Sequence, residues 1–73
     1  MLVTLIETPG RLMVAEAVSR LYAEADSLRS EAGDVAAEAL SQASMPLYMA
    51  AAALVEAAEE AERQAIAAER WLA

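Results

Sequence analysis

Residues 14–32 read VAEAVSRLYAEADSLRSEA, and apolar residues recur in this stretch at alternating spacings of four and three. This spacing places apolar side chains on one face of an α-helix, where they can pack against another helix. The recurring residues are Val14, Val18, Leu21, Ala25, Leu28 and Ala32. The pattern predicts a helix that begins at Pro9, because Thr8 can cap it and proline suits the first helical position.

The residues that follow predict further helical structure. Gly33 suits the left-handed position just after a helix, and Asp34 can cap the next one. A second apolar series then runs to the end of the chain through Leu40, Ala43, Leu47, Ala50, Leu54, Ala58, Ala61, Ala65, Ala68 and Leu72. Pro46 interrupts this series, so either one long helix kinks there or Ser44 caps a new helix with Pro46 in its first turn. We expect the break, because a continuous helix of about 38 residues would be roughly 57 Å long and would overhang the first helix.

The predicted fold is therefore all-α, a small helical bundle of two long helices, the second broken or kinked near Pro46. Its three helical segments are residues 9–32, 34–44 and 46–72, within a single domain that spans residues 1–73. Residues 1–8 are expected to be extended or frayed. Their strand-favouring part, Leu2 to Ile6, could instead fold as a helical turn onto the bundle, pair with its copy in a dimer, or add to the edge of a partner's sheet.

The residue types exclude most chemistry. The chain has no histidine, no cysteine and no lysine, and these supply most general bases, nucleophiles and Schiff-base formers. Its serines lack a histidine or lysine to activate them, and its two glycines form no phosphate-binding loop. We therefore expect a protein that is not an enzyme and that has no cofactor and no metal.

The size of the chain points to association. With 73 residues, twenty of them alanine, no phenylalanine and one tryptophan, a core made by one copy is thin. Small domains usually need a staple, and neither a disulfide nor a Cys or His metal site is possible here. The remaining route to stability is a homodimer or a complex with another protein.

The charge of the chain narrows the class of partner. Five arginines against twelve acidic residues give a net charge of −7, which disfavours direct nucleic-acid binding and anionic membranes. It favours a basic protein surface, although the same charge also serves solubility. The longest apolar run, Met45 to Val55, is too short to span a bilayer, and Met1 to Ile6 does not form a secretion signal. We expect a cytoplasmic protein of a bacterium with a GC-rich genome, or of the host cytoplasm if the gene belongs to a phage.

Two clusters are candidate partner-binding residues. Glu56, Glu59, Glu60 and Glu62 could form a solvated acidic face, an electrostatic patch for a partner, or a divalent-cation site, with Arg63 pairing with Glu59. Tyr48 and Met49, close to the break, and Trp71, close to the end, could be core residues or interface anchors.

Two functional hypotheses follow. In the first, the protein inhibits or sequesters a basic, nucleic-acid-handling protein complex, with the four glutamates steering the approach and Tyr48, Met49 and Trp71 anchoring it. These properties are similar to those of small phage-encoded inhibitors, including anti-CRISPR proteins, in general type and without a shared motif. In the second, the chain is a homo-oligomeric helical assembly module whose apolar faces close on copies of themselves.

Overall fold

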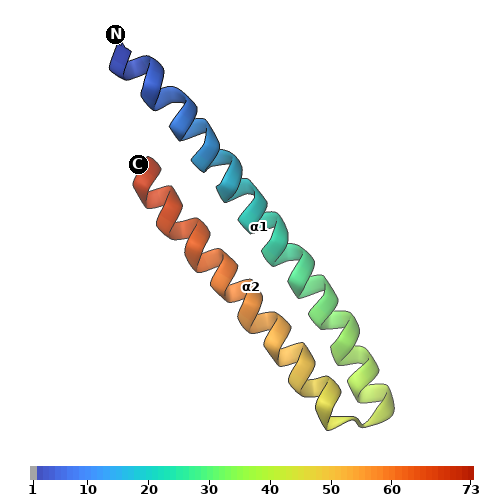
Figure 1. The fold of residues 1–73 in the computed structure, drawn as a ribbon. Coiled ribbons are helices and arrows are strands. Elements are labelled where there is room, and N and C mark those ends of the chain that lie inside the picture. Colours follow the sequence, from blue (N-terminus) through green and yellow to red (C-terminus); the bar gives the residue numbers. More distant parts are fainter. Residues whose placement is uncertain (1) are drawn as a thin grey trace.

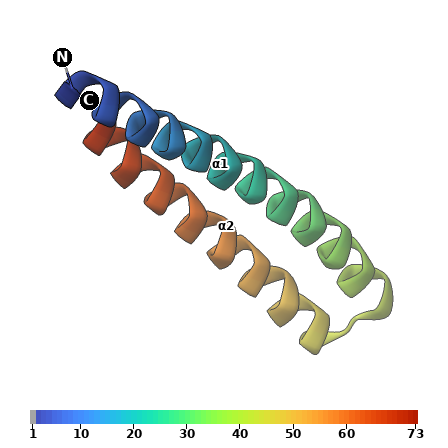
Figure 2. The same ribbon diagram turned by 45° about the horizontal axis from the view of Figure 1, so that its top comes forward.

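The computed structural model describes the backbone of residues 2–73 and the side chains of residues 10–73. Two helices, α1 (Leu2–Gln42) and α2 (Met45–Leu72), run antiparallel and are joined by a short turn (Figure 1). A second view shows the same side-by-side arrangement, and the hairpin measures 62 × 14 × 14 Å (Figure 2). The all-α prediction is confirmed. The prediction of three helical segments is wrong, because the described chain forms two helices.

The helix α1 continues through Gly33 and Asp34, where the sequence predicted a break between residues 32 and 34. Neither described glycine has a positive φ, so Gly33 is an ordinary helical residue. The reason lies in packing, because the apolar series of residues 14–32 continues at spacings of three and four through Val35 to Ala39, which is fully buried. Tertiary packing thus overrides the weak helix propensity of a single glycine.

The start of α1 also differs from the prediction. Residues 2–8 have a helical backbone, so the expected extended or frayed segment and the expected helix start at Pro9 are both wrong for these residues, and Met1 lies outside the described part. The fixed φ of proline suits a helix, but proline lacks an N–H and its ring crowds the carbonyl one turn back, which costs about 3 kcal/mol in a helix interior. The strand preference of Leu2 to Ile6 is a weak signal beside the long helix that follows.

The turn between the helices forms at Ala43 and Ser44. Ala43 has a φ of 49°, the left-handed conformation, and its N–H donates to the carbonyl of Leu40 at 3.4 Å, while that of Ser44 donates to the carbonyl of Ala39 at 3.1 Å. These two bonds are the Schellman arrangement that ends many helices. Ala43 therefore has the role that the sequence predicted for Gly33.

The start of α2 agrees with the prediction of a new helix after Ser44. The backbone of Ser44 is extended, its Oγ accepts a hydrogen bond from the N–H of Leu47 at 3.4 Å, and Pro46 lies in the first turn. The predicted break near Ser44 is thus confirmed, and it divides α1 from α2. The alternative of one helix kinked at Pro46 is wrong.

The core of the hairpin consists of small side chains. The buried residues recur every seven positions along most of each helix, as in a coiled coil. They are Val18, Ala25, Ala32 and Ala39 on α1, and Ala51, Ala58, Ala61 and Ala65 on α2. Ala25 packs against Ala58 and Ala61, and Leu21 and Leu28 cover this contact from the side. Alanine lets the two backbones approach closely, but each one removes little apolar surface from water.

The predicted apolar series agree with these buried positions over most of their length. The series of residues 14–32 lies on the face of α1 that is buried against α2, and the second series lies on the facing side of α2 from Leu47 onward. Three members of the second series are exposed: Leu40, Ala43 and Ala50. The prediction places all three on one continuous helical face. In the structure Leu40 belongs to α1, and Ala51 is buried in place of Ala50.

The two helices differ in length. The α1 helix has 41 residues and α2 has 28, and the first turns of α1 extend beyond the end of α2 (Figure 1). Among the hydrogen bonds of the described side chains, the one farthest from the turn is that from Nη2 of Arg11 to the carbonyl oxygen of Leu72, at 2.8 Å. No helix in the described part of the chain is both long enough and apolar enough to cross a membrane.

Candidate protein-binding surfaces

One flank of the hairpin is held by two polar contacts between the helices. Arg29 of α1 forms an ion pair with Glu62 of α2, and the hydroxyl of Tyr22 donates to the carboxylate of Glu69. Each partner lies seven residues from its counterpart, two helical turns in both helices, so the two contacts lie on the same flank. We call this side the ion-pair flank.

The contacts change the pKa values of their members. The hydrogen bond from Arg29 lowers the pKa of Glu62 below its ordinary value, and the same bond raises the pKa of Arg29. The hydrogen bond to Glu69 raises the pKa of Tyr22. Because these groups are at the surface, water screens the contacts, and they fix the relative positions of the helices more than they stabilise the fold.

The four glutamates predicted as a cluster do not form one surface. Glu62 is half-buried and bound to Arg29, while Glu60 accepts from Arg63 at 2.7 Å and from Gln64 at 3.3 Å. The bond from Arg63 lowers the pKa of Glu60. Arg63 therefore binds Glu60, whereas the sequence predicted a pair with Glu59. Of the four, Glu56 and Glu59 are the exposed carboxylates without an arginine in contact, within residues 10–73.

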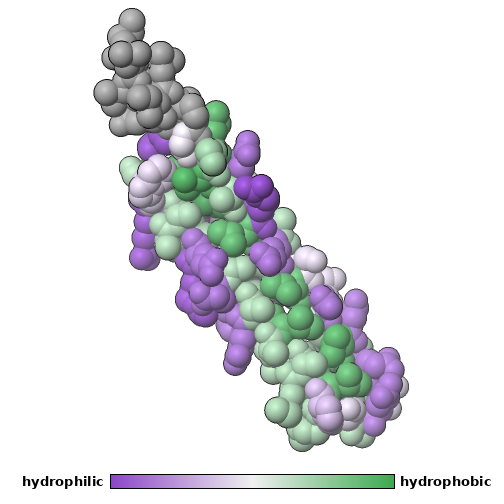
Figure 3. Space-filling model, in the orientation of Figure 1, coloured by the Kyte–Doolittle hydropathy of each residue, from purple (hydrophilic) through white to green (hydrophobic). Residues whose placement is uncertain are grey.

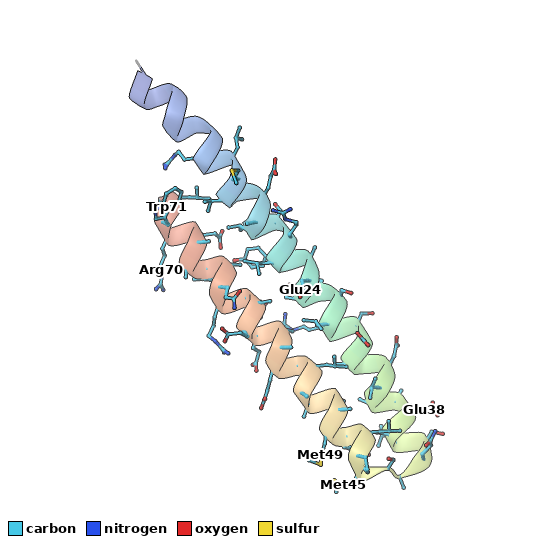
Figure 4. All side chains as sticks on the ribbon, viewed as in Figure 1. Glu24, Glu38, Met45, Met49, Arg70 and Trp71 are labelled. Carbon is cyan, nitrogen blue, oxygen red and sulfur yellow. The ribbon has the colours of Figure 1, made fainter. Side chains whose placement is uncertain are left out.

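The three predicted anchors are separated along α2. Tyr48 and Met49, exposed by 40% and 67%, belong to the first turns of α2, whereas Trp71, exposed by 61%, lies at its far end. Figure 4 shows Met49 and Trp71 at opposite ends of this helix. The 23 residues between Tyr48 and Trp71 correspond to about 35 Å of helix. All three are partly or largely exposed, so none belongs to the buried core, and a small partner surface cannot contact them together.

Sequence reasoning missed an acidic surface on α1. Glu24, Glu31, Asp34 and Glu38 recur at spacings of seven, three and four, and all four are exposed. We call them the acidic stripe, and Figure 4 labels its two ends, Glu24 and Glu38. Helical spacing places the stripe on the flank opposite to Arg29 and Tyr22. None of its members has an arginine in contact among the described side chains. The spacing was visible in the sequence, but the denser run at residues 56–62 drew attention from it.

The turn end of the hairpin carries apolar side chains that the predicted site included only in part. Leu40, Met45 and Met49 are each exposed by about two thirds or more, and no residue from Ala39 to Val55 is charged. The space-filling view shows hydrophobic residues along the middle of the visible face and hydrophilic residues at its edges, including one edge of the turn end (Figure 3).

The acidic side chains of the described part are not arranged as a metal site. Among residues 10–73, no three carboxylates converge as a group that could hold a metal ion. A surface depression of about 410 Å³ lies on α1 alone and is lined by Leu12, Ala15, Glu16, Ser19 and Arg20. With walls from one helix only, it cannot enclose a ligand as small-molecule sites do.

Comparison with known proteins adds no relative. No family model, no curated protein and no solved structure matches the chain.

Proposed function

We propose that this protein is a non-enzymatic inhibitor or sequestering factor that binds a basic, nucleic-acid-handling protein through the acidic stripe of α1. The observation that carries the proposal is the stripe itself, four exposed carboxylates over about 21 Å of helix with no arginine in contact in the described structure. A carboxylate that already contacts an arginine attracts a basic partner weakly, whereas a carboxylate without such a contact exerts its full electrostatic attraction.

The surface beside the stripe supports a protein partner. Across the same flank, α2 presents the exposed alanines Ala50, Ala53 and Ala57, which are small and uncharged. A partner segment can therefore approach closely there while its arginines and lysines reach Glu31 and Glu38. Proteins that bind nucleic acid carry such basic surfaces, because they must neutralise phosphates. An acidic helix that covers such a surface competes with the nucleic acid.

The test compares two variants of equal net charge. The stripe variant carries Glu24→Gln, Glu31→Gln, Asp34→Asn and Glu38→Gln, and the control variant carries Glu16→Gln, Asp26→Asn, Glu56→Gln and Glu59→Gln. Each set removes four of the seven net negative charges, so both chains have a net charge of −3. Immobilised wild-type protein captures partners from nuclease-treated lysate of a GC-rich bacterium, mass spectrometry identifies them, and each is then purified and titrated.

We expect a basic partner whose affinity falls as salt rises, with the stripe variant losing at least tenfold in affinity and the control variant losing much less. Equal losses in the two variants would leave only general charge attraction. A partner that is acidic, or whose affinity does not depend on salt, contradicts the proposal.

A further inference from the structure

The ion-pair flank becomes entirely uncharged toward the turn. Continuing the seven-residue spacing of Tyr22 and Arg29 leads to Ala36, and continuing that of Glu69 and Glu62 leads to Val55 and Tyr48. From the turn to Arg29 on α1 and to Glu59 on α2, this flank carries no charged residue over about 14 residues of each helix, or roughly 21 Å. We call this surface the turn-half face, formed by Gly33, Ala36, Leu40, Met45, Tyr48 and Val55.

The hairpin leaves this face uncovered. Leu40 is exposed by 70%, Met45 by 68%, and Tyr48 and Val55 by 40% each, while every side chain buried between the helices is alanine or valine. The fully buried positions are thus small, the leucines that flank them are only half-buried, and the large apolar side chains of the turn-half face stay largely exposed.

Gly33 gives an independent sign that something approaches this face. It is exposed in the interior of α1, its φ is not positive, and a Cβ at this position would meet no atom within 4 Å. Nothing within the described chain requires a glycine here, although glycine weakens a helix interior. Glycine is also used where another chain must come close to the backbone, and the turn-half face is where that approach would occur.

We propose that two copies of the chain associate through the turn-half face in an antiparallel arrangement, with the turns at opposite ends of the overlap. The twofold axis lies in the interface and is perpendicular to the helices, so α1 of one copy lies over α1 of the other and runs in the opposite direction. We place the axis midway between Leu40 and Gly33, which lie four and eleven residues from Ser44. Leu40 of each copy then lies over Gly33 of the other, and Ala36 lies near the axis. Tyr48 falls over Val55 by the same count.

The charge distribution favours a second copy as the occupant. Two chains of net charge −7 repel each other, and the turn-half face is the part where neither copy brings a charge to the contact. In the antiparallel overlap, the charged halves point in opposite directions, which keeps their repulsion small under physiological screening. The overlap covers roughly 400 Å² of each copy, about half of a standard interface, so the dimer is expected to dissociate in the micromolar range or above.

The first test measures mass against concentration by sedimentation, from low micromolar to about millimolar protein. Wild type should rise from 7.7 kDa toward twice that mass. Leu40→Glu should raise the dissociation constant at least tenfold, whereas Leu12→Glu should not. Leu12 is the matched control, since it is an exposed leucine on the same flank of α1, 28 residues or four seven-residue repeats away. A wild-type chain that stays at 7.7 kDa throughout, or equal effects of the two substitutions, overturns the proposal.

The second test uses the absence of cysteine in the chain. Ala36→Cys should form a disulfide-linked dimer under mild oxidation, because this residue lies near the twofold axis. Ala15→Cys, which is 21 residues away on the same flank, should stay monomeric. Cross-linking of both variants to the same extent would indicate random collision and overturn the arrangement.

The third test concerns the close approach at Gly33. Gly33→Gln should weaken the dimer at least tenfold, whereas Gly10→Gln should leave it unchanged, although both positions have open space around a Cβ in the single hairpin. Circular dichroism of both variants should show an equal or higher helix content, which separates loss of association from loss of folding. A Gly33→Gln dimer as tight as wild type would contradict the antiparallel register. The proposal does not depend on the acidic stripe, which lies on the other flank, and the stripe variant should dimerise at least as well as wild type.

Discussion

Arg29 of α1 and Glu62 of α2 form the ion pair that joins the two helices within residues 10–73. Its geometry sets the register of the hairpin, because Tyr22 and Glu69 repeat the contact one seven-residue step farther from the turn. The pair is exposed, so its effect on stability should be small and should depend on pH and salt.

The pH dependence of this ion pair has a definite sign. Arg29 lowers the pKa of Glu62 in the folded state, so the pair stabilises the fold above the ordinary glutamate pKa of about 4.3 and loses this effect as pH falls through the lowered pKa. Glu62→Gln should therefore reduce the melting temperature at pH 7 and have no effect in strong acid. Glu56→Gln, which also removes one charge and is exposed without an arginine in contact, should leave the melting temperature at pH 7 unchanged or slightly higher. A Glu62→Gln effect that stays constant from neutral to strongly acidic pH would show that the ion pair is not its cause.

The alanine core should not tolerate larger side chains. Ala58 is fully buried against Ala25, and a leucine in its place must separate the helices or adopt a strained rotamer. We expect Ala58→Leu to destabilise the fold by about 1–3 kcal/mol. Its exposed neighbour Ala57 is the matched control, and Ala57→Leu should change stability by less than about 0.5 kcal/mol. Urea unfolding of both variants measures the difference, and a stabilised Ala58→Leu protein would mean that the helices do not pack closely at this point.

Replacing the left-handed turn residue Ala43 by glycine should stabilise the hairpin. Ala43 has a φ of 49°, which is costly for a residue with a Cβ and free for glycine. Ala43→Gly should therefore stabilise the hairpin by about 1 kcal/mol. Ala37→Gly, in the exposed interior of α1, should instead destabilise it by about 1 kcal/mol. Thermal unfolding of the two variants should thus shift in opposite directions, and a shift of both to lower temperature would argue against the Schellman turn.

Replacing Gly33 by alanine should change stability in the opposite direction from replacing a glycine that ends a helix. Because it is helical and its Cβ position is open, Gly33→Ala should stabilise the isolated hairpin by up to about 1 kcal/mol. The measurement requires a concentration at which the chain is monomeric, so that the substitution acts on the helix alone. A loss of stability under these conditions would indicate a left-handed residue and a helix break at Gly33.

The sequence predicted local structure correctly where its signals for one conformation were not opposed by signals for another. The cap of α2 by Ser44, with Pro46 in its first turn, was predicted and is present. The face of α1 was predicted through Ala32 but not beyond, because Gly33 suggests a helix end, and only packing against α2 shows that α1 continues. A left-handed alanine at position 43 leaves no mark in a sequence, since alanine is the strongest helix former.

The candidate surfaces were predictable to a smaller extent. The exposure of Tyr48 and Met49 depends on which residues α1 covers, and this in turn depends on the position of the turn. Once Leu40 is assigned to α1 and not to a helix shared with Leu47, the apolar surface at the turn follows. The pairing of Glu62 with Arg29 joins residues that are 33 positions apart, which a reading of neighbouring charges cannot detect.

The hairpin topology also orders the folding of the chain. The cross-helix contacts described above join residues at similar distances from Ser44, so the separation along the chain grows from the turn outward, from 33 residues for Arg29 and Glu62 to 61 for Arg11 and Leu72. Closing a longer loop costs more entropy, so contacts near the turn form first and each one shortens the loop for the next. Folding should therefore proceed like a zipper from Ala43 and Ser44 toward the chain ends, and amide exchange should be fastest where the zipper closes last.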